Sequence, residues 1–564
     1  LAQIYAATEK LPISVNYNSA TGKYSVSKSY DATADAFGYF YPNLAESGWN
    51  YLDASMQTNN INSADEYVQK SRSLGYLEGY ATCNEIYTFY PNFYSAVFGT
   101  STVGQGTLTF LQENYDWLEK TAKENAGTDD YWLTVQGILA QVNGLLEGFS
   151  AGCNKVPGEA FTPTSLKGSL TKTNKYATLD KPTLLHFLLI NAWGDLYQIT
   201  MKYREVGNPI RLINARKNRK SYVDQMKVFD RCSAIIKLLD NNQDIVFGHA
   251  TWDTYESLGP RILKHIQRPT ISQGKFTASP PSQIWFSSSP GILSSVDDFF
   301  VIHGKANLGV IETTNELYNL RLLDKVVPST VLSWTRAVTS HIVAANGWDW
   351  GQQFSRYASG TYTNQWMALD LDLFKPGQPL PKGFFTVFEE VPGLTHVEDK
   401  TETLERQRYW GSYNVPYYSD ISEASGYAKL CSLDVNQCHD TAPRGLIFQQ
   451  YQSQITNVDG GKWMLAYNSF QNDTASQNDP CNAIACRGDL YAKKAEQGGF
   501  GALDVKVTSV QTAKLANPQI HARLGPTHDQ QPYFCWSQIN DEGYVHQGQP
   551  DCFNYDFTVF PPNF

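Results

Sequence analysis

At about 150 residues per domain, the 564 residues of this chain allow two to four domains or one large, elaborated domain. Hydrophobic residues make up 42% and charged residues 18%, glycine (41) and proline (26) are near average usage, and no repeat is visible, which excludes disordered, collagenous and solenoid proteins. Asp and Glu (55) outnumber Lys and Arg (45), the formal charge is −10 and no long basic stripe occurs, so we expect no nucleic-acid partner.

The first part of the chain, residues 1–210, is predicted to be rich in helices. Apolar residues recur there at spacings of three and four, the period of an amphipathic helix. The predicted helices are Asp65–Leu77, Gly106–Glu124, Asp129–Leu146 and Leu184–Tyr203. The longest apolar run, Leu184–Trp193, is interrupted by His186 and Asn191 and is shorter than the ~20 residues of a membrane span, so no transmembrane segment is expected.

Two terminal and local features favour a secretory route. The chain begins at Leu1 without Met, and its first residues lack a charged region followed by an apolar one, which fits a signal peptide that has been removed. The sequon Asn472-Asp473-Thr474 predicts glycosylation at Asn472, although one such match arises by chance in a chain this long.

One serine motif competes for the role of nucleophile. Gly148-Phe-Ser-Ala-Gly152 matches the G-x-S-x-G elbow, which requires a strand before the serine and a helix after it. The preceding residues have helical periodicity and the following ones begin no firm helix, so we interpret the motif as a glycine turn ending a helix rather than as a serine hydrolase site.

A basic segment separates the first part from the rest. Residues 211–231 open with five basic residues among eleven, from Arg211 to Ser221, and are predicted to be an exposed, trimmed linker. The alternative is that these basic residues only form a solvated, charged surface segment.

Residues 232–564 are predicted to mix strands and helices. Two apolar runs, Cys232–Leu239 and Ile245–Trp252, flank an Asx-rich turn and predict a hairpin. Pairing Leu239 with Ile245 places Cys232 opposite Trp252, and a slip of up to three residues places it opposite His249. Further strands are predicted at Phe299–His303, Leu308–Glu312, Trp366–Leu371, Phe384–Glu390 and Val505–Val510.

The chain has nine cysteines, an odd number. Eight group by proximity as Cys83 with Cys153, Cys431 with Cys438, Cys481 with Cys486, and Cys535 with Cys552, which leaves Cys232 alone. In an oxidising compartment these would be four disulfides and one free thiol; buried free cysteines in a reduced cytosolic protein are the alternative. No complete zinc-ligand set and no Walker or dinucleotide motif occurs, so we predict no metal and no cofactor.

Cys232 could act as a nucleophile if the chain were cut between Arg231 and Cys232. The cysteine would then carry an α-amino group whose usual pKa of about 7.7 to 8.0 suits a base for its own thiol. Such an enzyme needs a strand that begins at the nucleophile, donors for an oxyanion and a group that steadies the amine.

The sequence resembles the phospholipase B-like family, lamina-ancestor-related lysosomal and secreted proteins whose fold is similar to that of the N-terminal-nucleophile hydrolases. The stretches that carry the resemblance run along most of the chain and are Leu77-Glu-Gly-Tyr-Ala-Thr82, Cys232-Ser-Ala-Ile-Ile-Lys-Leu-Leu239, His249-Ala-Thr-Trp252, Glu312-Thr-Thr314, Ser359-Gly-Thr-Tyr-Thr-Asn-Gln-Trp-Met367, Tyr409-Trp-Gly-Ser-Tyr-Asn414, Ala442-Pro-Arg444, Asp504-Val-Lys-Val-Thr508 and Gly548-Gln-Pro-Asp551.

The resemblance implies an α+β fold, a four-layer αββα sandwich with a helix-rich N-terminal part, formed by both halves of a precursor that cleaves itself before Cys232. It implies Cys232, Asn414 and Arg444 as catalytic residues. The implied substrate pocket is formed by His249, Trp252 and Thr313. Five of these residues also have a purely structural interpretation. Trp252 could be a core residue, Thr313 an ordinary strand residue and His249 a buried histidine. Asn414 and Arg444 could be structural hydrogen-bonding residues.

The implied activity is removal of fatty-acyl chains from glycerophospholipids through a cysteine acyl-enzyme, in a lysosomal or secreted glycoprotein. Two alternatives stay open: an amidase that acts on linear N-acyl amides, and a catalytically silent secreted binding protein. The expected partner is therefore a lipid or an N-acyl small molecule, and the oligomeric state is left open.

Overall fold

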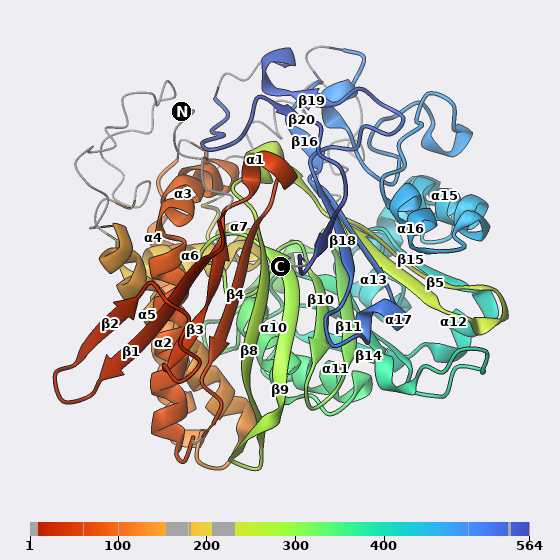
Figure 1. Ribbon diagram of the computed structural model, residues 1–564. Coiled ribbons are helices and arrows are strands. Elements are labelled where there is room, and N and C mark those ends of the chain that lie inside the picture. Colours follow the sequence, from red (N-terminus) through yellow and green to blue (C-terminus); the bar gives the residue numbers. More distant parts are fainter. Residues whose placement is uncertain are drawn as a thin grey trace.

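The computed structural model describes residues 9–59, 61–99, 101–153, 179, 182–205, 232–493, 496–539 and 543–562. In this part of the chain an eleven-stranded sheet packs against a six-stranded sheet, and helices cover the outer face of each (Figure 1). The rings of Phe247 and Phe299, one from each sheet, stack with centroids 5.7 Å apart. The predicted α+β class is confirmed.

The large sheet has the strand order β14-β13-β12-β11-β10-β9-β8-β4-β3-β1-β2. Its strands are β1 (Leu11–Asn18), β2 (Lys23–Ser27), β3 (Ala36–Tyr41), β4 (Asn50–Met56), β8 (Ile262–Ser272), β9 (Lys275–Ser288), β10 (Phe299–His303), β11 (Leu308–Thr314), β12 (Asn364–Asp370), β13 (Phe385–Val391) and β14 (Leu394–Asp399). All neighbours are antiparallel except β4 and β8, which pair in parallel from Asn50 opposite Ile262. This pair joins segments from before and after the basic linker in one sheet.

The small sheet has the order β15-β5-β6-β17-β18-β21 and is antiparallel. Its strands are β5 (Ser233–Leu238), β6 (Ile245–Ala250), β15 (Tyr409–Ser412), β17 (Asp504–Ser509), β18 (Ile520–Leu524) and β21 (Thr558–Phe560). The hairpin predicted after the linker is β5–β6. Its register differs by one residue from the expected one, because Leu238 rather than Leu239 lies opposite Ile245.

Short strands and helices complete the fold. The remaining strands are β7 (Trp252–Thr254), β16 (Phe500–Ala502), β19 (Phe534–Cys535) and β20 (Cys552–Phe553). The helices are α1 (Leu44–Ser47), α2 (Ala64–Ala81), α3 (Cys83–Phe98), α4 (Gln105–Asn125), α5 (Asp130–Cys153), α6 (Leu184–Asn191), α7 (Trp193–Lys202), α10 (Ser333–Val343), α11 (Gly347–Ser355), α12 (Thr401–Gln407), α13 (Ser419–Ser425), α14 (Tyr427–Leu433), α15 (Pro443–Tyr451), α16 (Val458–Leu465) and α17 (Val510–Ala513). Helices α2, α10 and α11 pack on the large sheet, and α15 and α16 on the small one.

All four predicted N-terminal helices are present, although the last is divided into α6 and α7. The glycines of the serine motif have a packing role, because the motif lies in the last turns of α5 rather than between a strand and a helix. A Cβ atom on Gly148 would lie 2.0 Å from the carbonyl oxygen of Tyr76 in α2, so only glycine allows the two helices to approach this closely. The Ser150 hydroxyl donates to the Leu146 carbonyl at 2.8 Å.

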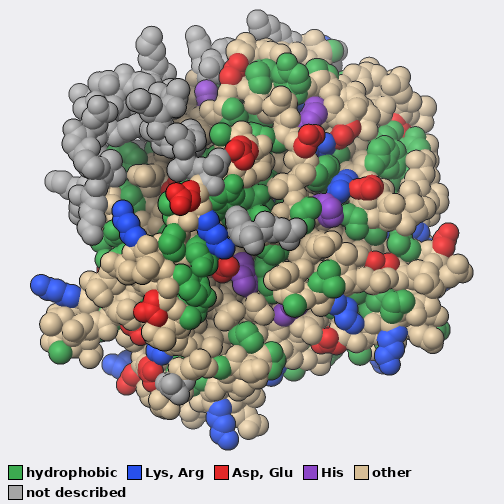
Figure 2. Space-filling model, in the orientation of Figure 1, with side chains coloured by type: hydrophobic (Ala, Val, Ile, Leu, Met, Phe, Trp, Pro, Cys, Tyr) green, Lys and Arg blue, Asp and Glu red, His purple; other side chains and the backbone are tan. Residues whose placement is uncertain are grey.

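All four predicted disulfides are present, and Cys232 is a free, buried thiol. The Cα–Cα separations are 5.6, 4.6, 4.0 and 4.0 Å in chain order, within the reach of a disulfide. Among the described residues, no helix is long and apolar enough to cross a bilayer. On the face in Figure 2, acidic and basic side chains are interspersed among uncharged ones.

Candidate active site

Cys232 directly precedes β5, where the small sheet meets the large one. The residue is 2% exposed and has a φ of 75°, in the left-handed region that few residues other than glycine adopt. The main-chain N–H of Trp252 hydrogen-bonds the sulfur. The thiol is therefore held at the head of a central strand.

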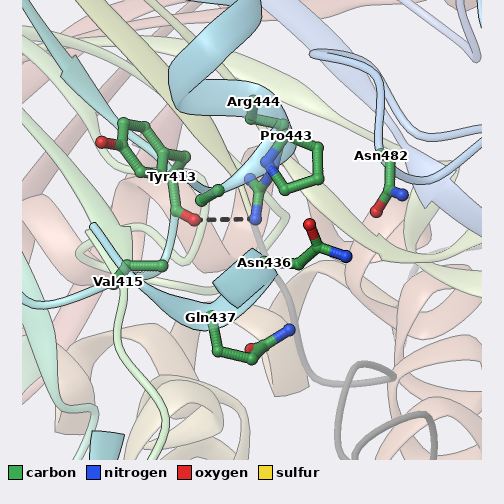
Figure 3. Close-up of a pocket in the computed structure, with 8 residues that line it drawn as sticks. Tyr413, Val415, Asn436, Gln437, Pro443, Arg444 and Asn482 are labelled. Atoms are coloured by element: carbon green, nitrogen blue, oxygen red, sulfur yellow. Dashed lines mark hydrogen bonds between the residues drawn. The ribbon is translucent and has the colours of Figure 1, made fainter. Parts of the chain in front are cut away.

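Arg444 connects three of the predicted site residues. It lies in the first turn of α15, and its guanidinium donates to the Cys232 carbonyl at 2.7 Å and to Asn414 Oδ1 at 2.7 Å. It also donates to the Tyr413 carbonyl at 2.8 Å, the bond drawn in Figure 3. Its carbon Cζ lies 4.4 Å from the centre of the Trp252 ring. A planar five-donor fork suits this task because its acceptors lie in different directions.

Asn414 lies beside Arg444 with a φ of 68°. Its Nδ2 donates to the Thr314 carbonyl at 2.5 Å. The Tyr427 hydroxyl donates to the main-chain carbonyl of Asn414 at 2.5 Å. The amide N–H group expected to stabilise an oxyanion is thus present near Cys232 but is engaged by a main-chain acceptor. The neighbouring Thr313 hydroxyl shares a 2.6 Å hydrogen bond with the Ser412 hydroxyl, which ties the two sheets together.

The Cys232 sulfur, a ring nitrogen of His249 and a carboxyl oxygen of Glu312 all lie within 4.8 Å of one another. His249 belongs to β6 of the small sheet, whereas Glu312 belongs to β11 of the large one. Burial, and then the charge of Glu312, raise the pKa of the Cys232 thiol well above its usual value. The thiol is therefore protonated here and needs a base before it can attack.

A buried carboxyl pair lies next to the thiol. Asp298 immediately precedes β10, and its carboxyl group hydrogen-bonds that of Glu312. The Tyr362 hydroxyl donates to the pair, 2.8 Å from Asp298 Oδ2 and 3.2 Å from Glu312 Oε1. Burial, with each carboxylate opposing ionisation of the other, raises both pKa values well above the usual range. For this hydrogen bond to form, at least one of the two carboxyl groups must carry a proton.

Four buried charges form an ion cluster near His249. Lys506 Nζ lies 2.7 Å from Asp504 Oδ1 and 3.6 Å from Asp297 Oδ2, and Arg261 pairs with the same two carboxylates. Burial first, and then the charge of Lys506, lower the pKa of His249 well below its usual value. His249 is therefore neutral.

A small recess of about 20 Å³, room for about one water molecule, opens beside Arg444. Its lining is mainly polar and consists of Tyr413, Val415, Asn436, Gln437, Ala442, Pro443, Arg444 and Asn482 (Figure 3). Trp252 instead packs against Ala485, Cys486 and Ala502. The recess reaches the guanidinium that binds the Cys232 carbonyl, although Cys232 itself does not line it.

Sequence reasoning gave no role to Asp298, Glu312, Tyr362 or the ion cluster, although some of these residues lie in the stretches that carry the family resemblance. A signal existed for the cluster, because Asp504 and Lys506 occupy alternate positions of an otherwise apolar strand and so share a face. Sulfur, imidazole and carboxylate are also zinc-ligand types, but the nearby cations Lys506 and Arg261 oppose a further divalent charge. Arg231 and the linker lie outside the described residues.

Comparisons with known proteins show the family. The profile of a family described as Phospholipase B matches residues 36–560. The chain is 32% identical to human "Phospholipase B-like 1" over 94% of this chain and 88% of that protein. It is 32% identical to "Phospholipase B-like protein D" of Dictyostelium discoideum (95% and 89%) and 29% identical to "Phospholipase B" of Crotalus adamanteus (96% and 91%). The chain belongs to the phospholipase B family.

Proposed function

We propose that this protein is an acyl hydrolase of the N-terminal-nucleophile type, which cleaves itself before Cys232 and then removes fatty-acyl chains from glycerophospholipids. The observation that carries the proposal is the free, buried Cys232 at the head of β5, with Arg444 on its carbonyl. Relatives named phospholipase B or phospholipase B-like support the substrate class.

The backbone at Cys232 favours cleavage at this bond. A left-handed conformation at a residue with a side chain costs on the order of 1–3 kcal/mol. Cleavage of the preceding peptide bond relieves this strain, because φ is no longer restricted once the residue becomes a chain terminus.

Cleavage would also create the base of the mature enzyme. The new α-amine of Cys232 lies on the residue whose carbonyl Arg444 binds at 2.7 Å, and a permanent positive charge nearby lowers the pKa of an amine. A lowered pKa keeps part of the amine unprotonated in an acidic compartment. The amine then accepts the thiol proton as the sulfur attacks the acyl carbon.

Asn414 would stabilise the oxyanion of the acyl-transfer step. In the uncut chain its Nδ2 donates to Thr314, so the donor must turn from that carbonyl to the substrate. His249, Trp252 and Thr313 would border the bound acyl group. Water then releases the fatty acid from the thioester on Cys232.

The cell compartment follows from the cysteines and the sequon. Four disulfides indicate an oxidising environment, and the Asn472 side chain is exposed and accessible to glycosylation. We therefore propose a lysosomal or secreted glycoprotein. Glycosidase treatment should reduce the mass of the secreted protein, and Asn472→Gln should abolish that change.

Mass spectrometry under denaturing conditions tests maturation. Cutting before Cys232 should give fragments of about 26 and 37 kDa before glycans, in proportion to 231 and 333 residues of the 63.3 kDa chain, and the larger should begin with Cys232. Cys232→Ala should remain whole. A Cys232→Ala chain that still divides at this bond would disprove self-cleavage.

A substrate panel tests the reaction. Matured protein is incubated with diacyl glycerophospholipids, lysolipids and N-acyl amides, with Cys232→Ala as the blank. Fatty acid should appear from the lipids and a thioester should form on Cys232. Release from amides alone would identify an amidase, whereas no turnover together with a thiol that resists alkylation would favour a binding protein.

A further inference from the structure

Self-cleavage needs a base other than the α-amine of Cys232, because this amine exists only after the cut. Before the cut, the nitrogen of Cys232 is an amide and cannot accept a proton from the thiol. The thiol is 2% exposed and its pKa is raised, so water is a poor substitute. A buried group within reach of the sulfur must therefore take the proton.

Among the described His, Cys, Asp and Glu side chains, His249 and Glu312 form a cluster with Cys232 in which the sulfur, a ring nitrogen and a carboxyl oxygen lie within 4.8 Å of one another. His249 is a poor proton acceptor because burial, and then the charges of Lys506 and Arg261, oppose a positive charge on its ring. Glu312 differs from His249 because its carboxyl group is hydrogen-bonded to Asp298 and Tyr362. The titratable and charged groups around Glu312 are Asp298, Tyr362, Lys506, Cys232 and His249.

We propose that Glu312, held by Asp298 and Tyr362, is the base that takes the Cys232 thiol proton during self-cleavage and returns it to the departing nitrogen. This inference rests on the proposed function, since it concerns the cut before Cys232. A carboxyl pair that holds one proton carries one negative charge and can accept a second proton, and a Glu312 carboxyl oxygen lies within 4.8 Å of the Cys232 sulfur.

Two oxygens of the pair support this role. Glu312 Oε2 and Asp298 Oδ1 are buried and receive no donor from any other described side chain or main-chain group. Tyr362 fixes the remaining oxygens, Asp298 Oδ2 and Glu312 Oε1, at 2.8 and 3.2 Å. The pair is therefore held rigidly and keeps acceptor capacity in a part of the protein where unmet polar atoms are costly.

Every proton and bond of the proposed reaction can be accounted for. The thiol proton passes to the pair, the sulfur bonds to the carbonyl carbon preceding Cys232, and the bond from that carbon to the Cys232 nitrogen breaks as the pair returns the proton to the nitrogen. The product is a thioester with a free α-amine. One water then attacks the carbonyl carbon, the C–S bond breaks, and an acid and the free thiol remain.

The test compares the rate of cleavage among full-length variants in a pulse-chase experiment in secreting cells. Glu312→Gln keeps the size of the side chain and removes the base, so cleavage should slow by about 10²- to 10⁴-fold. Tyr362→Phe should give an intermediate loss. Glu389→Gln is the matched control, because Glu389 is a fully buried glutamate of the same sheet that binds main-chain N–H groups of Tyr417 and Tyr418.

A pH profile separates a base from a structural residue. Purified, uncut Glu312→Gln should still cleave slowly through Cys232, at a rate that rises about tenfold per pH unit, because only spontaneous thiolate now attacks. Adding Cys232→Ala should abolish this residual cleavage. If Glu312→Gln fails to form its disulfides, Asp298→Asn decides, since loss of the proton-sharing partner should also slow the cut.

The outcomes distinguish the two proposals. An uncut wild-type chain, or cleavage of Cys232→Ala, refutes the proposed function itself. If the wild-type chain is cut and Cys232→Ala is not, but Glu312→Gln or Asp298→Asn cleaves at the wild-type rate, only the role of the carboxyl pair is refuted. If His249→Gln stops cleavage while the carboxyl variants cleave normally, the base is His249.

Discussion

Replacing Arg444 by lysine should destabilise the protein far more than the retained charge suggests. Arg444 is 4% exposed, and its guanidinium donates to the Cys232 carbonyl, the Tyr413 carbonyl and Asn414 Oδ1, and at 3.2 Å to Ser233 Oγ. One ammonium cannot reach all of these acceptors because they lie in different directions. Leaving two buried acceptors unmet at about 1–3 kcal/mol each lowers the free energy of unfolding by about 2–6 kcal/mol.

The measurement is urea unfolding followed by tryptophan fluorescence, with Arg444→Lys made in a Cys232→Ala background so that every sample is expected to be uncut. Arg72→Lys is the matched control, because Arg72 also pairs bidentately, with Glu147, but its side chain is 41% exposed. The control should lose less than about 1 kcal/mol. Equal losses for the two variants would refute the view that Arg444 holds the site together.

Three further predictions concern the oxyanion, acid stability and helix packing. Asn414→Ala should lower kcat of the matured enzyme by about 10²- to 10³-fold with a smaller change in KM, and an unchanged kcat would remove Asn414 from the oxyanion site. Burial lowers the pKa of His341 to about 3, so between about pH 6.5 and pH 3 the unfolded chain binds a proton that the folded chain does not. Each pH unit of acidification in this range should lower the free energy of unfolding by about 1.4 kcal/mol, and by less in His341→Gln. Unfolding measured at several pH values tests this. Gly148→Ala forces a Cβ to within 2.0 Å of the Tyr76 carbonyl and should lower stability by about 1–3 kcal/mol or more, whereas Gly127→Ala, with no atom within 4 Å of the new Cβ, should be neutral in the same thermal melts.

The sequence predicts elements well where one local pattern decides the structure. The hairpin after Cys232 has two apolar runs around an Asx-rich turn, and β10 has the predicted bounds Phe299–His303. Parity and proximity of the cysteines are sufficient to predict all four disulfides. The register of the hairpin is less certain by such reasoning, because a turn with one residue more or less preserves the same apolar pattern.

Strands with polar residues escape such reasoning. Strand β8 contains Lys264 and Arg268, both fully buried, and β9 contains two consecutive prolines. Lys264 is accommodated by Glu78 of α2 at 2.7 Å, a partner 186 residues away in the sequence. The pattern that identifies a buried strand is therefore absent from the strand itself, since its polar groups are satisfied by a helix that only the folded chain brings near.

The candidate site has the same long-range origin. The small sheet supplies Cys232 and His249, the large sheet supplies Glu312, and Arg444 comes from a helix on the outer face of the small sheet. The motifs carry the individual residues, but the hydrogen bond between Asp298 and Glu312 forms only after β10 and β11 have paired and the Tyr362 hydroxyl has reached the two carboxyl groups. The Cys232 thiol can therefore come near Glu312 only in a folded chain. On the proposed mechanism, this dependence restricts the cut before Cys232 to precursors whose two sheets are already assembled, so that the nucleophile is released only in molecules that can position a substrate.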